Sequence, residues 1–179
     1  MTPRAWSRVA LLIVVTVIVQ VGVINGLVLE GAHPDLFLLV AIVAGLTAGP
    51  QRGAMIGFVV GLVADLFVLT PFGLSSLVFV LVAFGVGATA SLPGGRAPNS
   101  FRITIAVAGS IAGTLLFTGI GALIGQPHLP RAQLFSVLAV VAIANAVLVI
   151  PAGSLMSWAV NIGPASRDLA AVRGGSAVR

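Results

Sequence analysis

The chain has 179 residues, of which 59% are hydrophobic and only 7% are charged. This composition is far from that of an average soluble domain, and it predicts an integral membrane protein. The formal charge of +5 comes from nine arginines against four acids. The arginines are scattered singly between apolar runs, which argues against nucleic acid as a partner. The absence of cysteine excludes disulfides, thiol catalysis and cysteine-based metal sites.

The first apolar segment, Val9–Leu29, is predicted to be a membrane span that the protein retains. Arg4 and Arg8 precede it, as basic residues precede the apolar part of a signal peptide. The segment is too long for such an apolar part, however, and Asn25-Gly26-Leu27 offers no A-x-A cleavage site. A removed signal peptide is therefore the less favoured interpretation.

Five further apolar segments follow the first. They are Leu36–Ala48, Ala54–Leu69, Leu74–Leu92, Ile103–Gly125 and Phe135–Val160. A helix needs about 20 residues to cross the hydrocarbon layer, so the first two of these five are short. One alternative joins those two into a hairpin that enters and leaves the membrane on the same side. The turn Gly49-Pro50-Gln51-Arg52-Gly53 carries a charge at its tip and favours full spans. We therefore predict one all-α transmembrane domain of about six helices over residues 1–160.

The arginines predict the orientation of this bundle. With the N-terminus inside, eight of the nine lie on the cytoplasmic side: Arg4, Arg8, Arg52, Arg96, Arg102, Arg167, Arg173 and Arg179. Only Arg131 would lie outside. This bias follows the positive-inside rule and predicts two cytoplasmic termini, with residues 161–179 as a flexible, arginine-containing tail. Attraction to anionic membrane lipid is the expected role of that tail.

Small residues form one face of the third predicted helix. Gly53, Gly57, Gly61 and Asp65 follow one another at intervals of four residues, so they line one side of a helix. Inside a membrane such a face lets a second helix approach closely. The carboxylate at its end is costly at membrane depth and suggests a functional site. The face is therefore a candidate for helix packing or for docking of a partner helix.

Asp65 has two other interpretations. It can make an ordinary interhelical hydrogen bond, or it can cap the following turn, Leu69-Thr70-Pro71-Phe72-Gly73. Asp35 is expected to have the simpler role of capping the second predicted helix, because Pro34-Asp35 suits a helix start.

Two amides also lie at membrane depth, Gln20 on the first span and Asn145 on the last. They can form a polar cluster that recognises a substrate or a partner, but single interhelical hydrogen bonds are the favoured interpretation. The pairs Gly109/Gly113 and Gly121/Gly125 match the small-residue association pattern, which we expect to serve packing within the chain.

Catalysis finds little support in the sequence. The chain has no cysteine or tyrosine. It also has no G-x-S-x-G motif, phosphate loop or histidine–carboxylate pair at helical spacing. His33 and His128 stand alone in predicted loops and do not indicate a metal site. We therefore expect that the protein is not an enzyme and binds no cofactor.

The region of roughly residues 30–90 resembles the rod shape-determining protein MreD family. It contains P-D-L at the start of one span, then G-x-x-R-G-x-x-x-G-F-x-x-G-L-x-x-D, a short turn and G-L. These positions are Pro34, Asp35, Leu36, Gly49, Arg52, Gly53, Gly57, Phe58, Gly61, Leu62, Asp65, Gly73 and Leu74. The remaining spans agree with the family in hydropathy and number.

The resemblance implies a non-enzymatic scaffold of cell elongation in the bacterial inner membrane. It implies an MreC-like bitopic partner, membrane proteins of lateral-wall peptidoglycan synthesis and, indirectly, MreB-like filaments. It also implies a fold similar to the substrate-binding S component of energy-coupling-factor vitamin transporters. Such an S component is the alternative function, although Val9–Leu29 lacks the A-x-x-x-A pattern common in their first span. A flippase for lipid-linked precursors is less favoured, because the arginines gather at the cytoplasmic edge.

Overall fold

The computed structural model describes residues 3–22, 34–67, 72–90, 98–125 and 131–160. In these ranges every regular element is a helix, and there are six of them. They are α1 (Pro3–Gly22), α2 (Leu36–Ala48), α3 (Pro50–Asp65), α4 (Leu74–Ala90), α5 (Asn99–Leu123) and α6 (Arg131–Val160). The predicted all-α fold and the number of helices are confirmed.

Several helix ends differ from the predicted ones. α1 begins six residues before Val9, and α3 begins at Pro50 instead of Ala54. Proline suits the first turn of a helix because the N–H that it lacks would have no intrahelical partner there. α3 also ends at Asp65, four residues before the predicted end. Residues 23–29, Leu92, Arg96 and the tail 161–179 lie outside the described residues.

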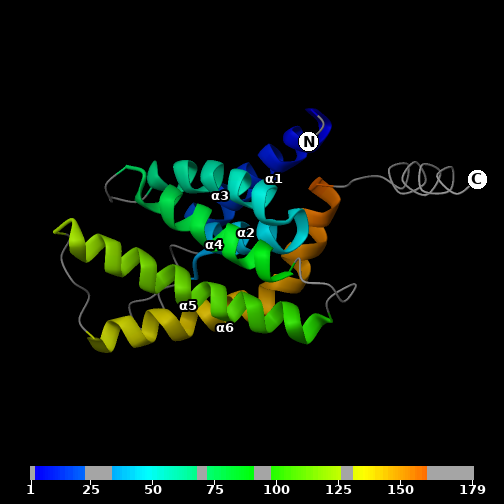
Figure 1. Cartoon of the computed structure of the whole chain (residues 1–179). Coiled ribbons are helices and arrows are strands. Elements are labelled where there is room, and N and C mark those ends of the chain that lie inside the picture. The colour runs from blue at the N-terminus through cyan, green and yellow to red at the C-terminus, as the bar shows by residue number, and fades with distance from the viewer. Residues whose placement is uncertain (1–2, 23–33, 68–71, 91–97, 126–130, 161–179) are drawn as a thin grey trace, which may run out of the picture.

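α2 is the centre of the bundle and contacts all five other helices. Its buried residues point in every direction around the helix axis, which is typical of a helix enclosed by others. Figure 1 shows α3 and α4 together on one side and the antiparallel pair α5 and α6 on the other. α1 packs mainly against α6.

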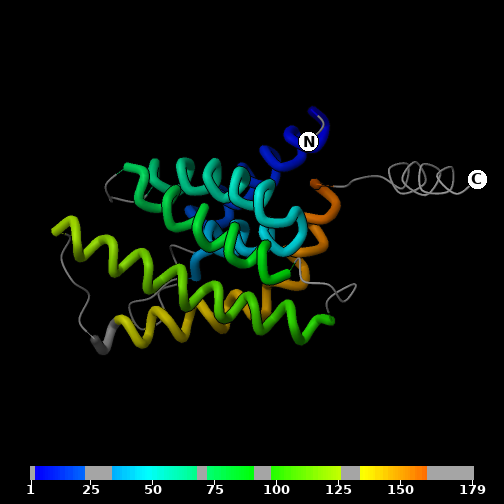
Figure 2. Tube along the Cα trace, in the orientation of Figure 1, coloured from blue at the N-terminus to red at the C-terminus, as the bar shows by residue number. Residues whose placement is uncertain are grey.

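α6 changes direction along its length. Figures 1 and 2 show its final part, in orange, turning away from the line of the preceding part. Pro151 lies inside this helix. Because proline has no N–H and its ring crowds the carbonyl four residues earlier, it bends a helix interior.

Three of the described helices are long and apolar enough to span a membrane: Pro3–Gly22, Asn99–Leu123 and Leu134–Val160. α2, with 13 residues, and α4, with 17, are shorter apolar helices. At 1.5 Å per residue, α2 is about 20 Å long, less than the hydrocarbon thickness of about 30 Å. Full spanning by α2 and α3, against the hairpin alternative, therefore stays a prediction.

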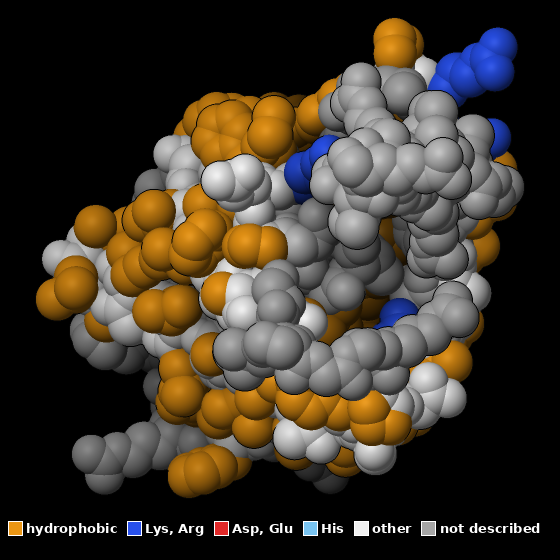
Figure 3. Space-filling model, turned by 45° about the vertical axis from the view of Figure 1, so that its right-hand side comes forward, with side chains coloured by type: hydrophobic (Ala, Val, Ile, Leu, Met, Phe, Trp, Pro, Cys, Tyr) orange, Lys and Arg blue, Asp and Glu red, His pale blue; other side chains and the backbone are white. Residues whose placement is uncertain are grey.

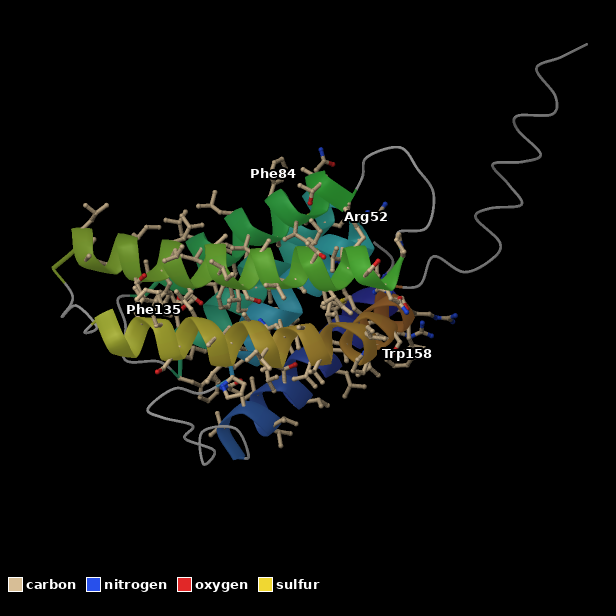
Figure 4. All side chains as sticks on the ribbon, turned by 90° about the horizontal axis from the view of Figure 1, so that it is seen from below. Arg52, Phe84, Phe135 and Trp158 are labelled. Atoms are coloured by element: carbon tan, nitrogen blue, oxygen red, sulfur yellow. The ribbon has the colours of Figure 1, made fainter. Side chains whose placement is uncertain are left out.

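The described side chains give the two ends of the bundle different charges. Figure 4 places Arg52 and Trp158 near one end and Phe135 at the other. Arg8 contacts Trp158, so the start of α1 belongs to the arginine end. Asp35 precedes α2 and Asp65 ends α3, and because these helices form an antiparallel hairpin around Gly49, both acids lie at the opposite end.

Candidate functional site

The glycine face of α3 is covered by helices of the same chain. A Cβ added at Gly53 would lie 2.6 Å from the Cα of Gly45 on α2. One added at Gly57 would lie 2.7 Å from the carbonyl oxygen of Phe79 on α4, and one at Gly61 would meet the Cα of Ser76. The three glycines thus allow backbone-to-backbone contact along the whole helix.

Small residues on α2 and α4 continue this arrangement. A Cβ on Gly45 would meet the Ala83 carbonyl, and one on Gly87 would lie 2.6 Å from the Cα of Pro50. We call the set Gly45, Gly53, Gly57, Gly61 and Gly87 the glycine seam. A partner helix can reach the seam only by displacing α2 or α4. Its observed use is packing within the chain, and direct docking of a partner on it stays a prediction.

Asp65 joins the end of α3 to the start of α4. Its side chain is 6% exposed, and its two oxygens accept hydrogen bonds from the backbone N–H groups of Gly73 at 2.8 Å and Ser75 at 3.1 Å. The Ser76 hydroxyl donates a third at 3.3 Å. The first N–H groups of a helix have no intrahelical acceptors and attract negative charge, so the carboxylate satisfies the N-terminus of α4. These three hydrogen bonds correspond to the interpretation in which Asp65 caps the turn that follows its helix.

Gln20 ties α1 to the start of α2. Its side-chain nitrogen donates to the Pro34 carbonyl at 3.1 Å, and its oxygen accepts from the Leu36 N–H at 2.9 Å. The Leu36 N–H is the first of α2 and has no acceptor within its own helix, so the Gln20 oxygen satisfies it. Gln20 and Asn145 are not brought together, because Asn145 lies in the contact between α5 and α6.

Asn145 is fully buried and bonds to a residue that the sequence analysis did not select. Its amide nitrogen donates to Ser110 Oγ at 2.7 Å, while that hydroxyl donates to the Ala106 carbonyl at 2.7 Å. The Asn145 Oδ1 has no hydrogen-bond partner among the described residues. The adjacent Gly109 was the available signal, because close packing of helices also brings neighbouring hydroxyls within reach.

The glycines of α5 serve packing in part. Cβ atoms at Gly109 and Gly113 would lie 3.1 Å from a Val86 methyl and 2.8 Å from a Leu38 methyl. Gly121 is buried, but Gly125 follows the helix with a φ of 80°. The predicted pair Gly121/Gly125 is therefore not a pair on one helix.

Asp35 caps α2 as predicted. Its Oδ1 accepts from the Leu38 N–H at 3.0 Å, three residues along. Burial raises the pKa of the Asp35 carboxyl above its ordinary value of 3.8, and the hydrogen bonds from Leu38 and Phe37 oppose that rise only in part. The side chain lies ahead of the helix, outside the spanning segments.

Arginines and a tryptophan occupy the opposite end of the bundle. The Arg8 guanidinium donates to the Trp158 carbonyl at 3.2 Å and lies 4.9 Å from the centre of the Trp158 ring. The Arg102 guanidinium packs against Gly153 of α6. Arg52 is exposed at the start of α3. Figure 3 brings this end forward and shows separate arginines among apolar side chains, and none of the described side chains in view is acidic.

The described residues contain no group of three or more histidine, cysteine, aspartate or glutamate side chains that could hold a metal ion. His33 and His128 lie outside the described ranges.

Comparison with known proteins gives one result. No curated protein and no solved structure matches the chain, so the likeness to transporter S components stays a prediction. Residues 4–158 match the family described as rod shape-determining protein MreD, which is a membrane family. This match extends from the first turn of α1 almost to the end of α6. The chain belongs to the MreD family, whose role is the determination of rod shape.

Proposed function

We propose that the protein is a non-enzymatic scaffold of the bacterial cell-elongation machinery. It would reside in the inner membrane with both termini in the cytoplasm. Its partners would be an MreC-like bitopic protein and membrane proteins of lateral-wall peptidoglycan synthesis, with MreB-like filaments reached indirectly. The observation that carries the proposal is the family match over residues 4–158, which includes parts of all six helices.

The packing of the bundle supports a scaffold with a defined shape. The glycine seam holds α2, α3 and α4 at backbone contact, and Asp65 fastens the α3–α4 connection with three hydrogen bonds. Tight packing of this kind transmits strain and does not deform continuously. A rigid bundle can hold partner helices in fixed relative positions.

The burial of the seam changes how partner docking would depend on it. We propose that the partner helix lies on the outer apolar sides of α3 and α4, where Met55, Phe58, Leu77, Leu81 and Phe84 are exposed. Figure 4 shows Phe84 pointing away from the bundle. The seam would then act indirectly, because it sets the spacing of the two helices that carry these side chains.

A pull-down of the tagged chain from its native membrane in mild detergent, read by mass spectrometry, tests the proposal. The wild-type chain should recover an MreC-like protein and wall synthases. Gly57→Leu should weaken this recovery, because the leucine meets the α4 backbone. Gly119→Leu on α5 is the matched control, since a Cβ at Gly119 meets nothing within 4 Å and the residue lies away from the proposed docking face.

Asp65→Asn should weaken recovery as well, because it disturbs the start of α4. Membrane fractionation and size-exclusion chromatography of each variant distinguish a lost interface from a lost protein. Equal recovery by the Gly57 and Gly119 variants would contradict the role of the seam. Recovery of an ATPase pair with its transmembrane coupling subunit would replace the scaffold with the alternative, a vitamin-transporter S component.

A further inference from the structure

An apolar groove of about 210 Å³ lies between α1 and α6. Leu39 and Val43 of the central helix α2 are buried and form its floor. Val15 on α1 and Leu155 on α6 line it as well and are about half exposed, at 47% and 53%, so they form its rim. In a membrane protein this rim faces lipid.

The groove offers its occupant no hydrogen bond from the described side chains. Thr16 is the one polar residue in the lining, and its hydroxyl donates to the Leu12 carbonyl of its own helix at 2.8 Å. An occupant of such a site must itself be apolar, because a polar group placed there would lose its hydrogen bonds to water without replacement.

One end of the groove is charged. Arg8 lies one turn before the groove residue Leu12, and Trp158 lies three residues after Leu155, so each continues the groove-lining face of its helix. The guanidinium stacks on the Trp158 ring at 4.9 Å and donates to the Trp158 carbonyl. Tryptophan at a helix end is typical of the membrane–water interface. The groove therefore runs from the interface into the hydrocarbon layer.

Arg8 has donors to offer at this end. A guanidinium carries five N–H donors in a planar arrangement that matches phosphate. Among the described residues no acid pairs with Arg8. The two acids in those ranges, Asp35 and Asp65, lie at the opposite end of the bundle. The charge at the groove's end thus suits an anionic headgroup.

The chemistry of the groove favours an acyl chain as its occupant. An apolar cavity of about 150 Å³ is enough for one benzene ring, so a groove of about 210 Å³ admits part of a hydrocarbon chain. An anionic phospholipid carries on one molecule both groups that this site suits, an apolar chain for the lining and a phosphate for Arg8.

We propose that the groove binds one acyl chain of an anionic phospholipid whose phosphate is held by Arg8 beside Trp158. This site goes beyond the role in rod shape and does not depend on the proposed protein partners. It is formed by α1, α2 and α6, whereas the glycine seam involves α2, α3 and α4.

Native mass spectrometry of the purified full-length chain tests the site. Equal amounts of phosphatidylglycerol and phosphatidylcholine with the same acyl chains are added, and the first bound lipid is measured. Arg8→Gln should lower the ratio of phosphatidylglycerol to phosphatidylcholine about fivefold, since one arginine near an anionic headgroup is worth about 1 kcal/mol. Val15→Trp fills the groove and should reduce binding of both lipids.

Each variant has a matched control on the same helix. Arg4→Gln removes an exposed charge one turn away, and Val14→Trp adds the same ring at an exposed residue outside the groove. Both should bind lipid as the wild type does. An equal loss with Arg4→Gln would mean diffuse surface attraction and would overturn the proposal. So would unchanged binding by Val15→Trp, or capture of a protein helix by a photo-crosslinker at residue 15.

Discussion

The carboxylate of Asp65 accepts a hydrogen bond from the Gly73 N–H at 2.8 Å, across the connection between α3 and α4. The same side chain accepts from Ser75 and Ser76. The last residue of one helix therefore caps the first turn of the next. This bond network explains how a carboxylate is accommodated in a chain as apolar as this one.

Asp65→Ala should lower the free energy of unfolding more than Asp65→Asn. Alanine leaves two backbone N–H groups and a hydroxyl without their acceptor, at about 1–3 kcal/mol for each buried group left unsatisfied. Asparagine keeps one acceptor oxygen. Unfolding in mixed micelles, followed by circular dichroism, measures both. Equal stability of Asp65→Ala and the wild type would show that water replaces the carboxylate at no cost.

Gly57→Ala and Gly85→Ala should change stability in opposite directions. The added methyl at Gly57 lies 2.7 Å from the Phe79 carbonyl oxygen, so α3 and α4 must move apart, at about 1–3 kcal/mol. The methyl at Gly85 meets nothing, and alanine is the better helix former by about 1 kcal/mol. The same unfolding measurement applies. If both alanine variants lost a similar amount of stability, the close packing of α3 against α4 at the glycine seam would be contradicted.

Asn145 and Ser110 should show coupling in a double-mutant cycle. Their bond of 2.7 Å crosses from α6 to α5, and hydrogen bonds between membrane helices are worth about 0.6–2 kcal/mol. The pair Ser110→Ala and Asn145→Leu should cost less together than the sum of the two single changes. If the loss of free energy of unfolding in the double variant equals the sum of the losses in the two single variants, the bond contributes nothing.

The raised pKa of Asp35 leads us to expect that the free energy of unfolding depends on pH. Its carboxyl pKa is raised in the folded state, so the folded protein holds the proton more tightly than the unfolded chain does. The resulting stabilisation is fully present below the unfolded value of 3.8 and is lost as the pH rises through the folded pKa.

Asparagine is also a good N-cap and does not titrate, so Asp35→Asn is the control for that dependence. Between pH 7 and pH 4, the wild type should gain stability relative to this variant. A constant difference across that range would mean that the folded-state pKa is not raised.

Hydropathy is sufficient to predict the number and order of the helices, because each apolar run is bounded by glycine, proline or charge. It does not predict their ends. α1 starts at Pro3, outside its apolar run, and α3 stops at Asp65 although Leu66-Phe67-Val68-Leu69 is apolar. Asp65 can cap α4 only if its own helix ends there, and spacing within one segment cannot show this.

For the candidate site, the sequence predicts which residues share a face of α3 but not what covers that face. An interval of four residues places three glycines and Asp65 on one face of α3, and the structure agrees. What covers that face depends on residues from other segments, such as Phe79 and Ser76 on α4. No periodicity within α3 distinguishes a neighbour in the same chain from a partner protein.

The most direct test of this account is a disulfide between α3 and α4 in native membranes. The chain has no cysteine, so Gly57→Cys with Ala83→Cys introduces a single pair. A Cβ at Gly57 lies 3.1 Å from that of Ala83, a little under the usual disulfide spacing of about 3.5–4.5 Å, so a small separation of α3 and α4 is enough for the bond to form. If the glycine face packs within the chain, oxidation should link the two residues of one molecule, and a Gly57/Gly85 cysteine pair should stay reduced. Failure of the first pair to link, with capture of another protein by Gly57→Cys alone, would contradict the account and return the face to partner docking.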